Sequence, residues 1–142
     1  MFERIHQLRE NSQAFVDQIN VHKAESIEES EKELVALNQK QLKSSEDLTG
    51  AALKPLYSPS YAKKKGYKKP DGYLSGDMYK EMFVDANEND DTFSMFSFKD
   101  YTKYFAGRYG DVFGIGDKSI KQASAMVMNN LRKRYIKLVI GK

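Results

Sequence analysis

The sequence has no cysteine and no tryptophan, and only three prolines and two histidines among its 142 residues. The lack of cysteine excludes disulfide bonds, thiolate metal sites, iron–sulfur clusters and cysteine nucleophiles from this chain. Long apolar runs are missing too, since the longest aliphatic or methionine run covers only residues 125–128. A bilayer span needs roughly 20 such residues, and the opening residues do not have the form of a secretory signal. We therefore expect one domain, residues 1–142, without a membrane partner.

The scarcity of histidine also argues against an enzyme. His6 and His22 are too far apart in the sequence to form the i, i+4 pair that a helix uses to hold a metal ion. Without a positioned base, the serines of the chain have no group to activate them as nucleophiles. We expect no catalytic residues, no metal ligands and no bound cofactor.

Two motifs that carry ligands in other proteins are incomplete here. Residues 85–89 have the form D-x-N-x-N, but a calcium loop then needs glycine and, at its twelfth position, glutamate. Asp90 and Phe96 occupy those positions, so a solvated turn is favoured, with weak cation binding as the alternative. The glycines between residues 107 and 116 match neither the phosphate-loop pattern nor the dinucleotide-binding pattern.

Residues 1–48 are expected to be helical, because glycine and proline are absent and residues that lose little freedom in a helix are abundant. The apolar stripe falters near residues 20–25, which leaves two alternatives, one long helix or two helices with a break at about residues 20–26. Ser26 and Glu29 have the spacing of a capping box, and Gly50 is expected just past the helix end. The stripe comprises Phe2, Ile5, Leu8, Phe15, Ile19, Ile27, Leu34 and Leu37.

Residues 50–77 are expected to form an extended basic loop or arm, because all three prolines fall there. Lysines with tyrosines between them suit a nucleic-acid surface, but they also suit a solvated mobile loop or an arm that lies on an acidic neighbour. No helix-turn-helix, RNP or zinc-finger pattern is present. The candidate arm residues are Tyr57, Tyr61, Lys63, Lys64, Lys65, Tyr67, Lys68, Lys69 and Tyr73.

The rest of the chain mixes strands and helices. Residues 78–116 are predicted to contain a hairpin, with strands at 82–86 and 92–98, followed by a short helix at 100–109 that Gly110 ends. Residues 117–140 are predicted to form a C-terminal helix. The predicted fold is α+β: a long N-terminal helix and the C-terminal helix packed on a small antiparallel sheet, with a long loop rich in proline, lysine and tyrosine.

The order of short motifs along the chain resembles that of the tail-completion and virion-morphogenesis proteins of tailed bacteriophages, which include small neck proteins. The resemblance covers about residues 34–139. Ser75 stands where that family usually has threonine, Asp77-Met78 fills its G-x-L position, and Glu81 stands where serine is common. The motif residues in this chain are Gly50, Pro55, Ser75, Gly76, Asp77, Tyr109, Gly110, Phe113 and Gly114.

The resemblance implies a structural, non-enzymatic subunit of a head–tail connector, neck or tail-completion ring. Its partners would be copies of itself in a ring, portal or connector proteins and tail proteins, with non-specific contact to packaged DNA. The chain would then be found in the neck or tail region of the virion, and in the host cytoplasm during assembly. The alternative function is a small nucleic-acid-binding module that uses the basic lysine and tyrosine loop.

Charge is unevenly distributed along the chain, with glutamates clustered at residues 25–33 and a basic segment at residues 118–142. Such patches can pair between neighbouring copies in a ring, or can be ordinary solvated surfaces. Two substitutions are expected to behave differently: Gly110→Val should damage folding, whereas a joint Lys63, Lys64 and Lys65→Ala change should spare folding and weaken docking.

Overall fold

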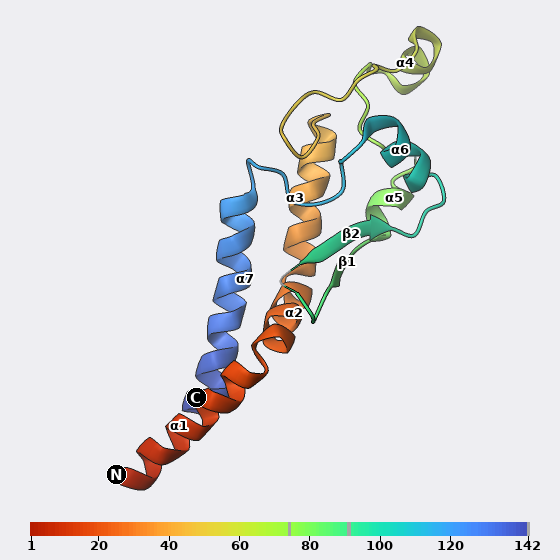
Figure 1. Ribbon diagram of the computed structural model, residues 1–142. Coiled ribbons are helices and arrows are strands. Elements are labelled where there is room, and N and C mark those ends of the chain that lie inside the picture. The colour runs from red at the N-terminus through yellow and green to blue at the C-terminus, as the bar shows by residue number, and fades with distance from the viewer. Residues whose placement is uncertain (74, 91, 142) are drawn as a thin grey trace.

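Helices pack on a small antiparallel sheet in the computed structural model, which describes residues 1–73, 75–90 and 92–141 (Figure 1). The predicted α+β class is therefore confirmed. The elements in chain order are α1 (Phe2–Asp17), α2 (Ile19–Glu29), α3 (Glu31–Lys43), α4 (Pro59–Lys65), α5 (Asp77–Lys80), β1 (Met82–Ala86), β2 (Phe93–Ser97), α6 (Thr102–Tyr109), α7 (Ile120–Tyr135) and the π-helical turn η1 (Ile136–Ile140).

The N-terminal helical region is three helices, so both predicted alternatives for it are wrong. The breaks fall at Gln18 and Ser30 rather than between residues 20 and 26. Ser26 lies inside α2, where its hydroxyl donates to the His22 carbonyl at 2.7 Å, so it does not cap a helix. The Ser30 hydroxyl donates to the Ser26 carbonyl in the same way, at 2.9 Å. Serine side chains that bond to the preceding turn compete with the helical backbone and bend helices.

The end of α3 also differs from the prediction. The helix stops at Lys43, and Gly50 lies beyond it in a separate turn with φ +85°. The Asp47 carboxylate organises this turn by accepting hydrogen bonds from the backbone N–H groups of Thr49 and Ala51, at 2.9 and 3.0 Å. The glycine thus belongs to a turn that an aspartate stabilises, and not to a helix cap.

The predicted hairpin is confirmed. Met82 pairs with Ser97 and Ala86 with Phe93 in an antiparallel register, and the backbone N–H of Val84 on the outer edge of β1 donates to the Glu31 carboxylate at 3.1 Å. That bond ties the hairpin to α3. One face of the hairpin is buried in the core, which is built from Ile27, Leu34, Val35, Leu42, Leu53, Met78, Tyr79, Met82, Val84, Met95, Val112 and Ala123.

Residues 59–65 form helix α4, so the prediction that residues 50–77 form an extended loop or arm is wrong for this stretch. The Ser58 side chain accepts a hydrogen bond from the backbone N–H of Tyr61, Pro59 occupies the first turn, and Gly66 ends the helix with φ +82°. Serine before proline at the start and glycine just past the end are ordinary helix boundary signals. The predicted region also contains the first residue of α5, Asp77.

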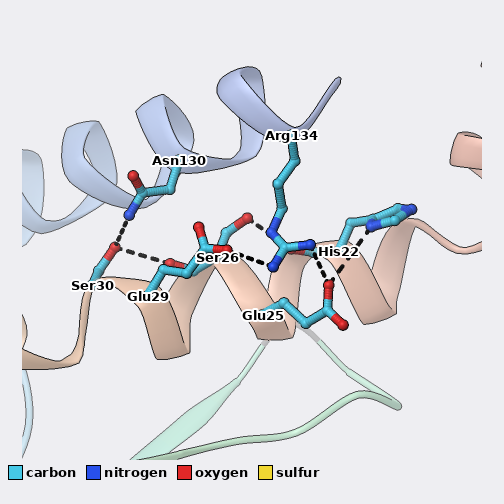
Figure 2. A network of polar contacts seen from close by, with 7 residues as sticks. All are labelled: His22, Glu25, Ser26, Glu29, Ser30, Asn130 and Arg134. Atoms are coloured by element: carbon cyan, nitrogen blue, oxygen red, sulfur yellow. Dashed lines mark hydrogen bonds and ion pairs between the residues drawn. The ribbon is translucent and has the colours of Figure 1, made fainter. Parts of the chain in front are cut away.

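A polar network joins α2 to α7 (Figure 2). The Arg134 guanidinium on α7 reaches the carboxylates of both Glu25 and Glu29, which lie one turn apart on α2. One turn earlier on α7, the Asn130 amide donates to the hydroxyl of Ser30, the residue that follows α2, at 2.8 Å. Two of the early glutamates therefore pair with the basic C-terminal helix inside one chain.

Helix α1 projects from the body of the molecule, and the N-terminus lies at the end far from α4 (Figure 1). Its second half is held by η1 and the end of α7, because the Asn11 amide donates to the Val139 carbonyl at 3.3 Å and Phe15 is buried. Its first half leaves Phe2 86% exposed and Ile5 57% exposed. The predicted apolar stripe is thus buried or half-buried from Phe15 onward, whereas Phe2 and Ile5 at its start are exposed.

Candidate functional site

Three tyrosines of the arm gather around one lysine. The ammonium nitrogen of Lys65 lies 5.1, 5.8 and 5.0 Å from the ring centres of Tyr57, Tyr61 and Tyr67. Tyr57 and Tyr61 also meet edge to face, with ring centres 4.9 Å apart. An ammonium group is attracted to the negative faces of aromatic rings. Together with Asp71, these residues form what we call the Lys65 cluster.

Asp71 completes the cluster and closes the arm on itself. Its carboxylate lies 3.4 Å from the Lys65 ammonium and accepts a hydrogen bond from the Tyr57 hydroxyl at 3.2 Å. Lys65 also donates to the Tyr73 carbonyl, and the Tyr57 backbone N–H donates to the Lys68 carbonyl at 2.9 Å. The arm is consequently a folded loop with its own polar centre.

The cluster is anchored to the core through Tyr79 on α5. The Tyr79 side chain is buried, and its hydroxyl donates to the Asp71 carbonyl at 2.5 Å. Burial raises the pKa of the Tyr79 hydroxyl well above the ordinary tyrosine value, and it raises the pKa of Tyr57 as well. Burial alone would lower the pKa of the Lys65 ammonium, but contact with the Tyr67 hydroxyl and the charge of Asp71 raise it, so Lys65 stays charged.

The protein is expected to lose stability above about pH 10, because Tyr57 and Tyr79 hold their protons more tightly when folded than when unfolded. The folded state then binds more protons than the unfolded state, so stability is complete below the unfolded pKa and falls as the pH rises. The raised pKa of Lys65 acts in the same direction. For each proton that the folded state binds in excess of the unfolded state, the free energy of unfolding falls by up to about 1.4 kcal/mol per unit rise in pH.

Urea titrations between pH 7 and 11 measure this loss. Tyr79→Phe should cost about 1 kcal/mol at pH 7 through its missing hydrogen bond, but it should lose less additional stability above pH 10. If the free energy of unfolding fell equally with pH in the unmodified protein and in the variant, Tyr79 would not be a source of the pH dependence.

The remaining arm residues lie outside the cluster. Tyr73 packs edge to face on Tyr79, with ring centres 5.5 Å apart. Four lysines are exposed and form no ion pair with another described residue: Lys63, Lys64, Lys68 and Lys69. The structure therefore brings together Tyr57, Tyr61, Lys65 and Tyr67 and leaves these four lysines in solvent.

A pocket of about 500 Å³ lies between α4 and α6. The arm contributes one wall, and α6 with the residue before it contributes the other through Tyr101, Tyr104, Phe105, Arg108 and Tyr109. Of these five residues, only Tyr109 was expected from the sequence to be a site residue. Their helical spacing is visible in the sequence, but nothing in the sequence indicates that α6 lies opposite the arm. We call this cavity the α4–α6 pocket.

The motif residues lie where the arm, α5 and the segment after α6 meet the core. The Tyr109 hydroxyl donates to the Pro55 carbonyl at 3.3 Å, and the Ser75 hydroxyl donates to the Asp77 carboxylate at 2.7 Å. Gly76 precedes α5 with φ +84° and lies under the Tyr73 ring.

The segment that follows Gly110 is attached to α3. Its Val112 carbonyl accepts a hydrogen bond from the buried Asn38 amide at 2.8 Å. Phe113 meets the ring of Phe105, with ring centres 6.5 Å apart, and Gly114 lies against Leu48. Phe113 and Gly114 thus help to pack this segment against α6 and against the turn that follows α3.

Neither histidine lies in a group of metal-ligating residues. Among the described residues, no three histidine, aspartate or glutamate side chains are close enough to hold a metal ion. His6 pairs with Glu10 at 3.1 Å on exposed α1, and the His22 ring stacks on Phe15, with ring centres 4.2 Å apart. Both histidines thus have structural neighbours.

Comparisons of the chain with models of protein families, with curated proteins and with solved structures find no match. The resemblance to tailed-phage neck proteins accordingly stays a prediction from the order of motifs. Within the part of the chain that the structure describes, no helix combines the length and the apolar composition that crossing a membrane requires.

Proposed function

We propose that this chain is a structural, non-enzymatic subunit of a tailed-bacteriophage particle, part of a head–tail connector, neck or tail-completion ring. The order of motifs supports the location. The observation that carries the assembly role is the projecting first half of α1, which holds Phe2 and Ile5 in solvent. A contiguous exposed apolar surface that a monomer does not cover is typical of a protein interface.

A second exposed apolar surface lies on the outer face of the hairpin. The Phe83 and Phe98 rings stack, with centres 4.3 Å apart, and Phe98 is 74% exposed. Phe96 adds a third ring, 6.2 Å from Phe83. Rings and filaments form when one surface of a subunit contacts a different surface of the next. Two separate apolar surfaces on one chain meet this requirement.

Particle composition tests the proposal. The chain should be found by mass spectrometry in purified virions, and a joint Phe2→Ser and Ile5→Ser change should reduce its incorporation at least tenfold. Met128→Ser on α7 is the matched control, because Met128 is also an exposed apolar residue. Absence of the chain from virions, or full incorporation of the α1 variant, would refute the role.

The arm lysines should separate docking from folding once Lys65 is treated by itself. A joint Lys63→Ala and Lys64→Ala change is expected to leave the melting temperature unchanged and to reduce incorporation, because both side chains lie in solvent. Lys65→Ala should lower the free energy of unfolding by about 1–3 kcal/mol, since it leaves the partly buried Asp71 without its cation. Thermal melts paired with incorporation measure both effects.

Equal incorporation of the double variant and the unmodified chain would contradict a docking role for these two lysines. The joint change of Lys63, Lys64 and Lys65 to alanine removes two exposed charges and also the cation that pairs with Asp71. A loss of incorporation by that variant could come from either cause, so it does not test docking by itself.

Nucleic-acid binding through the basic loop is the second candidate function. It is favoured by the four exposed arm lysines that form no ion pair within the described part of the chain. Binding of this kind weakens steeply as salt is added. Absence of DNA binding by the purified protein at low salt would remove this candidate.

A further inference from the structure

The α4–α6 pocket has a rigid aromatic wall. The Tyr101 hydroxyl accepts a hydrogen bond from the Met78 backbone N–H at 3.2 Å, and the Tyr109 hydroxyl donates to the Pro55 carbonyl at 3.3 Å. The Tyr57 hydroxyl donates a hydrogen bond to the Asp71 carboxylate at 3.2 Å. These rings are oriented before any ligand arrives, which reduces the entropy lost on binding.

Other rings at the pocket remain available. Tyr104 is 70% exposed, and no other aromatic ring of the described residues packs against it. The hydroxyls of Tyr61 and Tyr104 form no hydrogen bond to another described residue. An exposed tyrosine face can stack on a flat ligand, and a free hydroxyl can bond to the ligand edge.

The charge at the pocket is positive. Arg108 lies over the Tyr109 ring at 5.8 Å and has no carboxylate partner among the described residues. The Lys103 ammonium lies 5.3 Å from the Tyr104 ring centre. None of the described residues that line the pocket is acidic. The charge of Lys65 is matched by Asp71, so Arg108 is the lining cation that remains unpaired.

These features select the class of ligand. A flat aromatic group fits the walls, and an anion fits Arg108, the lining cation that has no carboxylate partner among the described residues. An apolar peptide would satisfy the rings but would leave this cation unused. Nucleotides carry both groups, and stacking on aromatic side chains in a basic groove is how single strands are bound. In a duplex the bases are stacked and paired, so none is available to the pocket.

We propose that the α4–α6 pocket binds single-stranded nucleic acid, with one base stacked against Tyr104 and the adjoining phosphate held by Arg108. This site differs from the general basic loop in that α6 supplies the stacking ring and the unpaired cation. The proposal does not depend on a role in the virion.

Fluorescence anisotropy with a labelled oligothymidylate of about 15 nucleotides, on the scale of one single-strand site, tests the pocket at low salt. The single strand should bind more tightly than a duplex of equal length. Tyr104→Ala and Arg108→Ala should each weaken binding about tenfold, the range expected for one stacked base or one charged contact. Tyr104→Phe should keep most of the affinity, because the ring remains.

Two matched controls lie outside the pocket. Phe98→Ala removes an equally exposed ring from the hairpin, and Arg132→Ala removes an exposed cation from α7. Both should bind within about twofold of the unmodified protein. Arg108→Ala should also reduce the slope of log affinity against log salt by about 0.7, the value for one phosphate of a single strand, whereas Tyr104→Ala should leave that slope unchanged.

Three results would overturn the proposal. The first is equal affinity for single strand and duplex, and the second is a Tyr104→Ala protein that binds normally while lysine variants do not. Either of these two results would mean that binding depends on surface charge alone and not on the pocket. The third is no binding of the oligonucleotide at low salt by protein whose circular dichroism shows it folded. If pocket variants then blocked particle assembly, the occupant would be a protein segment.

Discussion

Replacement of Leu42 by alanine is expected to lower the free energy of unfolding by about 2–5 kcal/mol. Leu42 lies on α3 and is completely buried in the core shared by α3, α5, the hairpin and α7. Truncation removes buried apolar surface and leaves a cavity that the neighbouring helices fill only in part. Small domains are stable by about 5–15 kcal/mol in total, so this single change removes a large share.

Urea unfolding monitored by circular dichroism measures the effect. Leu56→Ala is the matched control, because the same truncation is made at a half-exposed position of the arm. That change should stay within about 0.5 kcal/mol of the unmodified protein. A similar loss for both variants would mean that the core is not centred on α3.

Gly110→Val is expected to cost more than about 1–3 kcal/mol, the range for a residue held in a sparsely populated backbone conformation. Gly110 follows α6 with φ +78° and ψ −142°, a region that essentially only glycine adopts. A Cβ atom at this position would meet nothing within 4 Å. The expected damage thus comes from backbone strain, which a β-branched residue increases, and not from a clash.

Gly107 provides a control of opposite sign. It lies three residues earlier, inside α6, with no positive φ and with open space where an alanine methyl group would lie. Gly107→Ala should therefore stabilise the protein by about 1 kcal/mol, the difference in helix propensity. Thermal melts of both variants decide the matter, and a Gly110→Val protein as stable as the unmodified one would show that the turn adjusts freely.

Local signals in the sequence were sufficient for several elements. The hairpin and the end of α6 at Gly110 are set by short-range patterns, namely turn residues between strands and a glycine past a helix. The breaks at Gln18 and Ser30 were not predicted, because neither position carries proline or glycine. The Ser30 break accompanies side-chain bonding to the preceding turn inside a good helical sequence.

The candidate site could be predicted only in part. The tyrosines and lysines of the arm are conspicuous by composition, but their division between the Lys65 cluster and solvent depends on Asp71, which lies six residues after Lys65. The contribution of α6 to the pocket depends on tertiary contacts such as the bond between Tyr109 and Pro55, which are 54 residues apart. Sequence spacing does not encode such long-range contacts.

The bond between Arg134 and Glu25 spans 109 residues, so the two halves of the α2–α7 interface are made far apart in time during synthesis. Helix α2 leaves the ribosome early, and the apolar side chains of Phe15 on α1 and Ile27 on α2 stay uncovered until α7, which is translated much later, packs against them. Contacts of such high sequence separation slow folding, because a long loop must close before they form. A nascent or truncated chain that ends before residue 120 consequently exposes an amphipathic, aggregation-prone surface, and chaperones of the producing cell are expected to bind it.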